Sequence, residues 1–88
     1  MNDEVILSYL EELAEKLEIL VRDENINIEE SSSSGGLCRV EGKHVIILNS
    51  KASIKEKIQV MIAALQLFDL RNMYIKPVIR ELLEGHEE

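Results

Sequence analysis

Tryptophan is absent from this 88-residue chain, and aromatic residues make up only 3% of it. A hydrophobic core must therefore be built from isoleucine, leucine, valine and methionine. Hydrophobic residues account for 45% of the chain, which is an ordinary share for a globular protein. At 88 residues the chain has room for one domain, so we expect residues 1–88 to form a single domain. A domain of this length buries only about 60 to 65% of the surface that its unfolded chain exposes. Its stability should be modest, and self-association would increase it.

Cysteine is nearly absent too, and long apolar runs are missing. The single cysteine, Cys38, cannot form an intramolecular disulfide, which agrees with a reducing compartment. Residues 1–4 are acidic where a secretory signal needs positive charge, and no apolar run approaches the roughly 18 to 20 residues that span a bilayer. The sequence therefore predicts a cytoplasmic protein with no membrane partner.

Basic residues are in the minority, with ten against 17 acidic residues and a formal net charge of -7. This is the wrong sign for neutralising phosphates, so no direct nucleic-acid partner is predicted. Acidic residues gather near both ends, which is typical of solvated helix faces and leaves a basic protein partner open. They include Glu11, Glu12, Glu15, Glu18, Glu81, Glu84, Glu87 and Glu88. The basic residues of the middle, which either solvate a face or dock an acidic partner, are Arg39, Lys43, Lys51, Lys55 and Lys57.

Residues 3–24 carry apolar side chains at the spacing of an amphipathic helix. The stripe consists of Ile6, Leu10, Leu13, Leu17 and Leu20, widened by Leu7, Ala14 and Val21. Asn2 or Asp3 can cap the N-terminus, where Asp3 and Glu4 complement the helix dipole. We expect residues 23–25 to end this helix.

Three short strands are predicted after this helix. Ile26–Glu29 alternates apolar and polar residues, as an edge strand with one buried face does. Leu37–Val40 and Lys43–Asn49 flank Glu41-Gly42, where the glycine supplies the positive φ that a tight β-hairpin needs. The segment Ser31–Gly36 is rich in serine and glycine, so we expect a loop there.

The second strand of the hairpin is apolar at consecutive positions, Val45–Leu48, so both of its faces must be covered by helices or by another subunit. A second helix begins near Ile54, where Ser53 and Glu56 match a capping box, and its apolar residues occupy most of its circumference. Pro77 suits the first turn of a short last helix. These elements predict an α+β fold with helices packed on one face of a small antiparallel three-stranded sheet.

Cys38 and His44 are the candidate pair for nucleophilic chemistry, since a thiol and an imidazole on adjacent strands can act as nucleophile and base. The hairpin register decides whether they meet. A two-residue connection, Glu41-Gly42, pairs Cys38 with Val45 and places the imidazole on the opposite face. A three-residue connection that ends at Lys43 places both groups on one face. Because no third orienting residue is evident and free cysteines are commonly small buried hydrophobes, we favour a structural role.

No metal, cofactor or phosphate site is predicted. Cys38, His44 and His86 lack the paired spacing of zinc ligands. The segment Ser31–Gly36 is followed by a strand and not by a helix N-terminus, and no lysine follows it at P-loop spacing. Tyr74 either anchors the linker before the last helix in the core, which we favour, or contributes to an interface.

The segment Gly35–Gly42, GGLCRVEG, together with Val45–Asn49, Glu56-Lys57-Ile58 and Phe68-Asp69-Leu70, resembles a group of short uncharacterised bacterial proteins. The resemblance covers about half the chain and implies a bacterial origin but no mechanism. A weaker similarity is topological, because a helix, a small sheet and then an apolar helix resemble the opening unit of minimal zinc metallopeptidases. The HExxH motif of that family is missing, since Gln59–Leu65 reads QVMIAAL. This similarity implies at most a scaffold without its metal.

The leading hypothesis is a non-enzymatic, homodimeric interaction or regulatory module, because the apolar residues of Val45–Leu48 and of the second helix exceed what a lone small domain can cover. The candidate interface residues are Val45, Ile47, Val60, Ala64, Leu67 and Tyr74. The alternative is a small thiol-dependent enzyme or redox-sensitive protein that uses Cys38. A third hypothesis, an antitoxin-like or adaptor partner for a basic protein, depends on the acidic ends.

Overall fold

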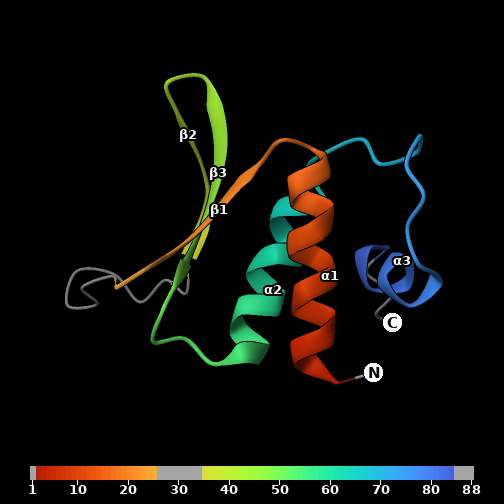
Figure 1. The fold of residues 1–88 in the computed structure, drawn as a ribbon, viewed down its shortest axis with the longest axis horizontal. Coiled ribbons are helices and arrows are strands. Elements are labelled where there is room, and N and C mark those ends of the chain that lie inside the picture. The colour runs from red at the N-terminus through yellow and green to blue at the C-terminus, as the bar shows by residue number, and fades with distance from the viewer. Residues whose placement is uncertain (1, 26–34, 85–88) are drawn as a thin grey trace.

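The computed structural model of the chain describes residues 2–25 and 35–84. Three helices and three strands make up this part of the chain (Figure 1). They are α1 (Asp3–Lys16), β1 (Leu20–Glu24), β2 (Gly35–Val40), β3 (Lys43–Asn49), α2 (Ile54–Leu65) and α3 (Pro77–Leu83). The predicted α+β class is therefore confirmed.

The sheet is mixed. Its strand order is β1-β3-β2, so β3 occupies the centre. β2 and β3 form the predicted antiparallel hairpin, in which Val40 pairs with Lys43. β1 lies parallel to β3, with Leu20 opposite Val45. The prediction of a fully antiparallel sheet is therefore wrong for one of the two strand pairs.

α1 is shorter than the helix predicted over residues 3–24. It begins as predicted, with the side chain of Asn2 accepting a hydrogen bond from the amide of Val5 at 2.9 Å. It ends at Lys16, and Leu20–Glu24 forms β1. The helix prediction is wrong for Leu20–Glu24, because the apolar spacing within five residues cannot distinguish a strand period from a helix period. The predicted strand Ile26–Glu29 lies outside the described residues.

A Schellman motif ends α1. The amide of Ile19 donates to the carbonyl of Ala14 at 2.9 Å. The amide of Glu18 donates to the carbonyl of Glu15, also at 2.9 Å. Glu18 has a φ of 64°, in the left-handed region where glycine is the usual residue. Because a glutamate occupies this position, the sequence carries no glycine signal for the end of the helix.

The hairpin turn consists of Glu41 and Gly42, whose φ angles of 53° and 83° are both positive. This is the pattern of a type I′ turn, whose twist matches the strands that it joins. β2 begins at Gly35, so the prediction that Gly35 and Gly36 belong to a loop is wrong. At Gly35 the backbone of β3 approaches so closely that a Cβ atom would overlap the carbonyl oxygen of Ile47.

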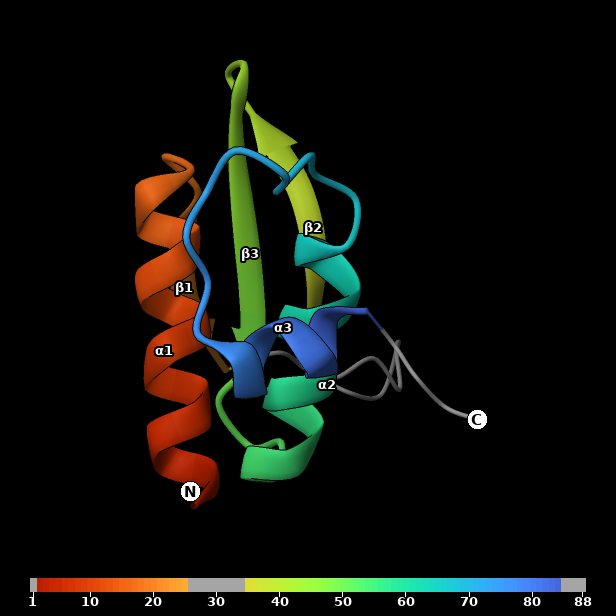
Figure 2. The same cartoon turned by 90° about the vertical axis from the view of Figure 1, so that its right-hand side faces the viewer.

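All three helices lie on one side of the sheet (Figure 1). α1 and α2 form the layer next to the sheet, with α1 contacting β1 and α2 contacting β2 and β3 (Figure 2). α3 adds a further layer, because it packs on α1 and α2 and contacts no described strand. α2 is therefore buried on more than one side, as its sequence predicted.

The core lies between the sheet and the helices. Its largest fully buried side chains are Leu10, Ile46, Leu48, Met61 and Leu65. Burying each such side chain contributes about 1.5 to 3 kcal/mol relative to leaving it exposed. Ile75 and Ile79, which are 7% and 2% exposed, extend the core beneath α3. The central strand thus supplies the sheet side of the core.

Both later helices begin where the sequence predicted. The hydroxyl of Ser53 accepts a hydrogen bond from the amide of Glu56 at 3.1 Å. The carboxylate of Glu56 accepts one from the amide of Ser53 at 3.0 Å, which completes the capping box of α2. Pro77 occupies the first turn of α3, where its missing amide hydrogen costs no helical hydrogen bond.

Gly35→Ala should destabilise the protein far more than Gly36→Ala. Gly35 has a φ of 137° and an added methyl group would overlap β3, whereas no atom lies within 4 Å of a Cβ at Gly36. We expect Gly35→Ala to lower the free energy of unfolding by at least about 2 kcal/mol and Gly36→Ala to change it by less than about 1 kcal/mol. Urea denaturation measures both, and equal losses would contradict this placement of Gly35.

Glu18→Gly should stabilise the protein. The left-handed conformation costs an L-residue about 1 kcal/mol or more, and glycine avoids this cost at a smaller loss of chain entropy. We expect the free energy of unfolding to rise by about 0.5 to 1 kcal/mol. Glu15→Gly within α1 is the matched control and should lower it by about 1 kcal/mol. If thermal unfolding shows both variants to be destabilised, α1 does not end in this motif.

Candidate functional site

The candidate interface residues do not form one surface. Val45 and Ile47 lie on the outer face of the sheet, because Ile46 between them points into the core. Val45 is only 3% exposed, although none of the described helices covers this face. Leu20 of β1 and Cys38 of β2 are directly opposite it and flank it on both sides. A second subunit is therefore not needed to bury this valine.

The rest of the outer sheet face alternates apolar and charged groups. Arg22 lies opposite Ile47 and forms an ion pair with Glu24 on the same strand. Leu20 and Val40 are 57% and 45% exposed, but they belong to opposite edge strands. Arg22 and Lys43 border the apolar residues of this outer face, and single exposed apolar residues of this kind are normal on a protein surface.

A groove of about 410 Å³ lies between α2 and β2. Its lining consists of Gly35, Gly36, Leu37, Gln59, Val60, Ala63, Ala64 and Leu67. No lining residue is charged. Ala64 is buried and Val60 is partly buried, whereas Leu67 is 72% exposed at the end of the groove. The candidate interface residues of this region thus share one apolar groove.

β2 is the edge of the sheet that borders this groove. Arg39 is the only charged residue of this strand. The opposite edge strand, β1, carries the consecutive charged residues Arg22, Asp23 and Glu24. Charged side chains on an edge strand disfavour pairing with another chain, so β2 is the less protected edge.

Sequence reasoning missed the β2 side of this groove. The sequence predicts a strand at Leu37 and a loop at the two preceding glycines, and it indicates no role in binding for any of them. The available signal was the lack of proline and acidic residues between Gly35 and Val40, since such residues protect edge strands. That signal has meaning only once the strand order shows that β2 is an edge.

Tyr74 is 77% exposed, so the prediction that it anchors the linker in the core is wrong. The next residue, Ile75, is the anchor, since it is 7% exposed and belongs to the core. Tyr74 lies at a different pocket, between α1, the linker and α3, together with Tyr9 and Lys76. This places it far from the sheet residues of the candidate interface.

The structure does not bring Cys38 and His44 together. The hairpin has the two-residue connection, in which Cys38 pairs with Val45 and Arg39 pairs with His44. The thiol therefore lies on the outer face of the sheet and the imidazole on the inner face. The ring of His44 meets that of Phe68 edge to face, with centroids 5.0 Å apart. This geometry gives His44 a packing role.

Two of the basic residues of the middle of the chain, Lys55 and Lys57, are paired with acidic residues. The Nζ atom of Lys55 lies 2.9 Å from a carboxylate oxygen of Asp3 in α1. The Nζ atom of Lys57 lies 3.6 Å from a carboxylate oxygen of Asp23 in β1. These two lysines thus connect the start of α2 to acidic residues of the first half of the chain.

Within residues 2–25 and 35–84, no group of three or more His, Cys, Asp or Glu side chains is arranged to hold a metal ion. His86 and Ser31–Ser34, the remaining candidates for metal and phosphate binding, lie outside these ranges. None of the helices in these ranges is long and apolar enough to cross a membrane.

The carboxyl group of Glu11 in α1 lies in surroundings that disfavour its charged form. Partial burial raises the pKa of its carboxyl group above the ordinary value, and the nearby charge of Asp23 raises it further. Lys57 lowers it, but by less. The ionised carboxylate of Glu11 therefore costs the folded protein stability.

No protein-family model, curated protein or solved structure matches this chain. The resemblance of the GGLCRVEG hairpin to short bacterial proteins stays a prediction, as does the topological similarity to zinc metallopeptidases.

Glu11→Gln should stabilise the protein at neutral pH. Because folding raises the pKa of this carboxyl group above its ordinary value of 4.5, its charge lowers stability as the pH rises through the folded-state pKa. The stability that the protein gains when glutamine replaces Glu11 should therefore be absent at about pH 4 and present at about pH 7. Thermal unfolding at both pH values measures it, with Glu12→Gln on the same helix as a control. A gain that does not depend on pH would contradict this account.

Proposed function

We propose that this protein is a non-enzymatic interaction module that forms a homodimer through the edge of β2 and the groove beside α2. The observation that carries the proposal is an edge strand without acidic residues or proline that borders an uncharged apolar groove. Leu67 projects from this groove with 72% of its surface exposed. An exposed edge of this kind is a template for pairing with another strand.

A second copy of the chain fits this surface by symmetry. Two β2 strands can pair antiparallel about a two-fold axis, so that both copies present the same surface and the two sheets join. α2 lies beneath β2 on the same flank of the molecule (Figure 2), so the two α2 helices would approach each other as well. Ala63, small and exposed on α2, allows that approach.

Electrostatics favour this flank for self-association. Each copy carries a net charge of -7, so most contacts between two copies would bring carboxylates together. The groove avoids this repulsion, because none of its lining residues is charged. Stable interfaces bury about 800 Å² per partner, a small part of the 5973 Å² that one copy exposes.

The non-enzymatic character of the module is supported by the separation of its reactive groups. Cys38 and His44 lie on opposite faces of the sheet, so the thiol has no imidazole base within the hairpin. The thiol-dependent alternative therefore loses the pairing that motivated it. We further propose that the module is cytoplasmic, as a single free cysteine favours, and that its partner is protein and not nucleic acid.

Leu67→Lys should weaken the dimer without unfolding the subunit. Leu67 is largely exposed in one copy, so a charge there costs the isolated subunit little, but it would be buried in the dimer without a partner. We expect the dissociation constant to rise at least tenfold, which corresponds to about 1.4 kcal/mol. Sedimentation equilibrium at concentrations on the order of 50 µM measures it.

Leu20→Lys is the matched control, because Leu20 is also exposed but lies on β1, at the other edge of the sheet. It should leave the dimer unchanged. A wild-type chain that is folded and monomeric at this concentration would refute the homodimer. A dimer that Leu20→Lys weakens and Leu67→Lys does not would place the contact elsewhere and refute the role of the groove.

A further inference from the structure

A second pocket, of about 230 Å³, lies between α1, the linker before α3 and α3 itself. Its lining consists of Tyr9, Glu12, Leu13, Lys16, Tyr74, Ile75, Lys76 and Ile79. The floor is apolar, because Leu13, Ile75 and Ile79 are 5%, 7% and 2% exposed. The pocket belongs to the helical side of the molecule and shares no residue with the groove beside α2.

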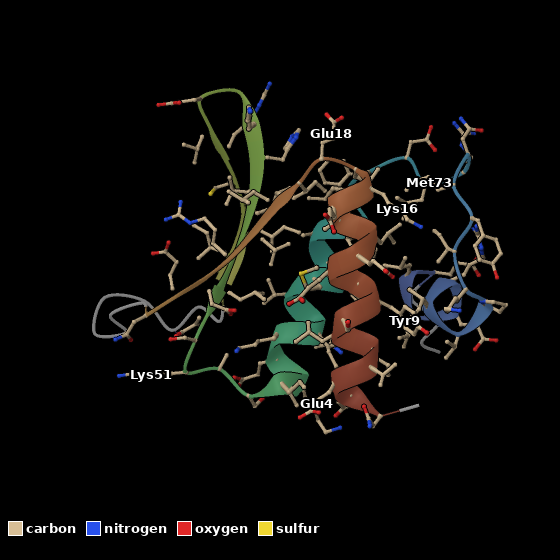
Figure 3. The ribbon with its side chains drawn as sticks, viewed as in Figure 1. Glu4, Tyr9, Lys16, Glu18, Lys51 and Met73 are labelled. Carbon is tan, nitrogen blue, oxygen red and sulfur yellow. The ribbon has the colours of Figure 1, made fainter. Side chains whose placement is uncertain are left out.

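One face of α1 supplies half of this pocket. Tyr9 precedes Glu12 and Leu13 by three and four residues, and Lys16 follows them by four and three, so the four side chains lie on one face of the helix, in a row that runs from Tyr9 to Lys16. Figure 3 shows Tyr9 and Lys16 projecting from α1 on the side where α3 and the segment of Met73 lie. An aromatic ring and an ammonium group thus stand at the two ends of the row.

The opposite wall adds a second ring and a second cation. The Nζ atom of Lys76 lies 4.9 Å from the centroid of the Tyr9 ring, a cation–π contact that holds this ammonium group at the pocket. Among the described residues, no carboxylate forms an ion pair with Lys16 or Lys76. Glu12, the one acidic lining residue, is exposed, so solvent screens its charge.

We propose that this pocket binds a small aromatic carboxylate. The ring would pack on the apolar floor beside Tyr74, and the carboxylate would meet the ammonium group of Lys76, with the positive charge of Lys16 at the other end of the row adding to the attraction. A cavity of about 150 Å³ holds benzene, so the volume of about 230 Å³ has room for one ring with a short acidic arm. A free phosphate would gain nothing from the apolar floor. This proposal does not depend on the homodimer.

Titration with phenylacetate, followed by ¹H–¹⁵N NMR of the full chain, tests the proposal, and phenylacetamide is the neutral probe of the same shape. We expect millimolar binding of phenylacetate, with shifts concentrated on the pocket face of α1 and on residues 74–79. The amide should bind at least about fivefold more weakly, because it lacks the charge that the lysines recognise.

Lys16→Gln and Lys76→Gln should each weaken phenylacetate binding at least about threefold and leave phenylacetamide binding unchanged. Lys51→Gln is the control, since Lys51 lies beyond the sheet at the other side of the molecule (Figure 3) and should have no effect. All three lysines are exposed, so the spectra of the free variants should retain the folded pattern. Equal affinity for acid and amide, or equal losses in all three variants, would overturn the proposal.

Discussion

The packing of Ile46 and Leu48 against the inner helices is the interaction on which the rest of the structure depends. Both side chains are fully buried, and the strand that carries them pairs with both other strands. Side chains alternate between the two faces along a strand. Burial of these two residues therefore fixes the face on which each of the remaining residues of the sheet lies. It turns His44 inward, toward Phe68, and it leaves Cys38 on the outside. The register of one strand thus separates the two most reactive side chains of the hairpin.

The same strand order produces the two unequal edges that motivate the proposed function. β3 is central, so β1 and β2 are both edges, but only β1 carries a run of charged residues. β2 instead borders the uncharged groove that α2 forms beneath it. The second pocket lies on the other side of the helical layer and is lined by cations and tyrosines. A self-association surface and a ligand pocket can therefore coexist in one small domain without sharing residues.

Local signals in the sequence were reliable wherever a short-range hydrogen bond or a conformational restriction decided the outcome. The capping box of Ser53 and Glu56, Pro77 at the start of α3 and Gly42 in the hairpin turn all involve neighbours within a few residues. The end of α1 was missed because Glu18 occupies a position that glycine usually takes. Gly35 was missed because its requirement comes from the backbone of β3, more than ten residues away in sequence.

The sequence by itself determined the α+β class, the hairpin, the start of both later helices and an aliphatic core, because propensity, capping and periodicity act over a few residues. Only the tertiary structure decided that β1 runs parallel to β3, that β2 is an edge above a groove, and that Tyr74 is exposed while Ile75 is buried. These outcomes depend on which segments meet in space. Apolar segments that are distant in sequence compete for the same core, and this competition decides which of them meet. The periodicity of a single segment carries no information about its partners.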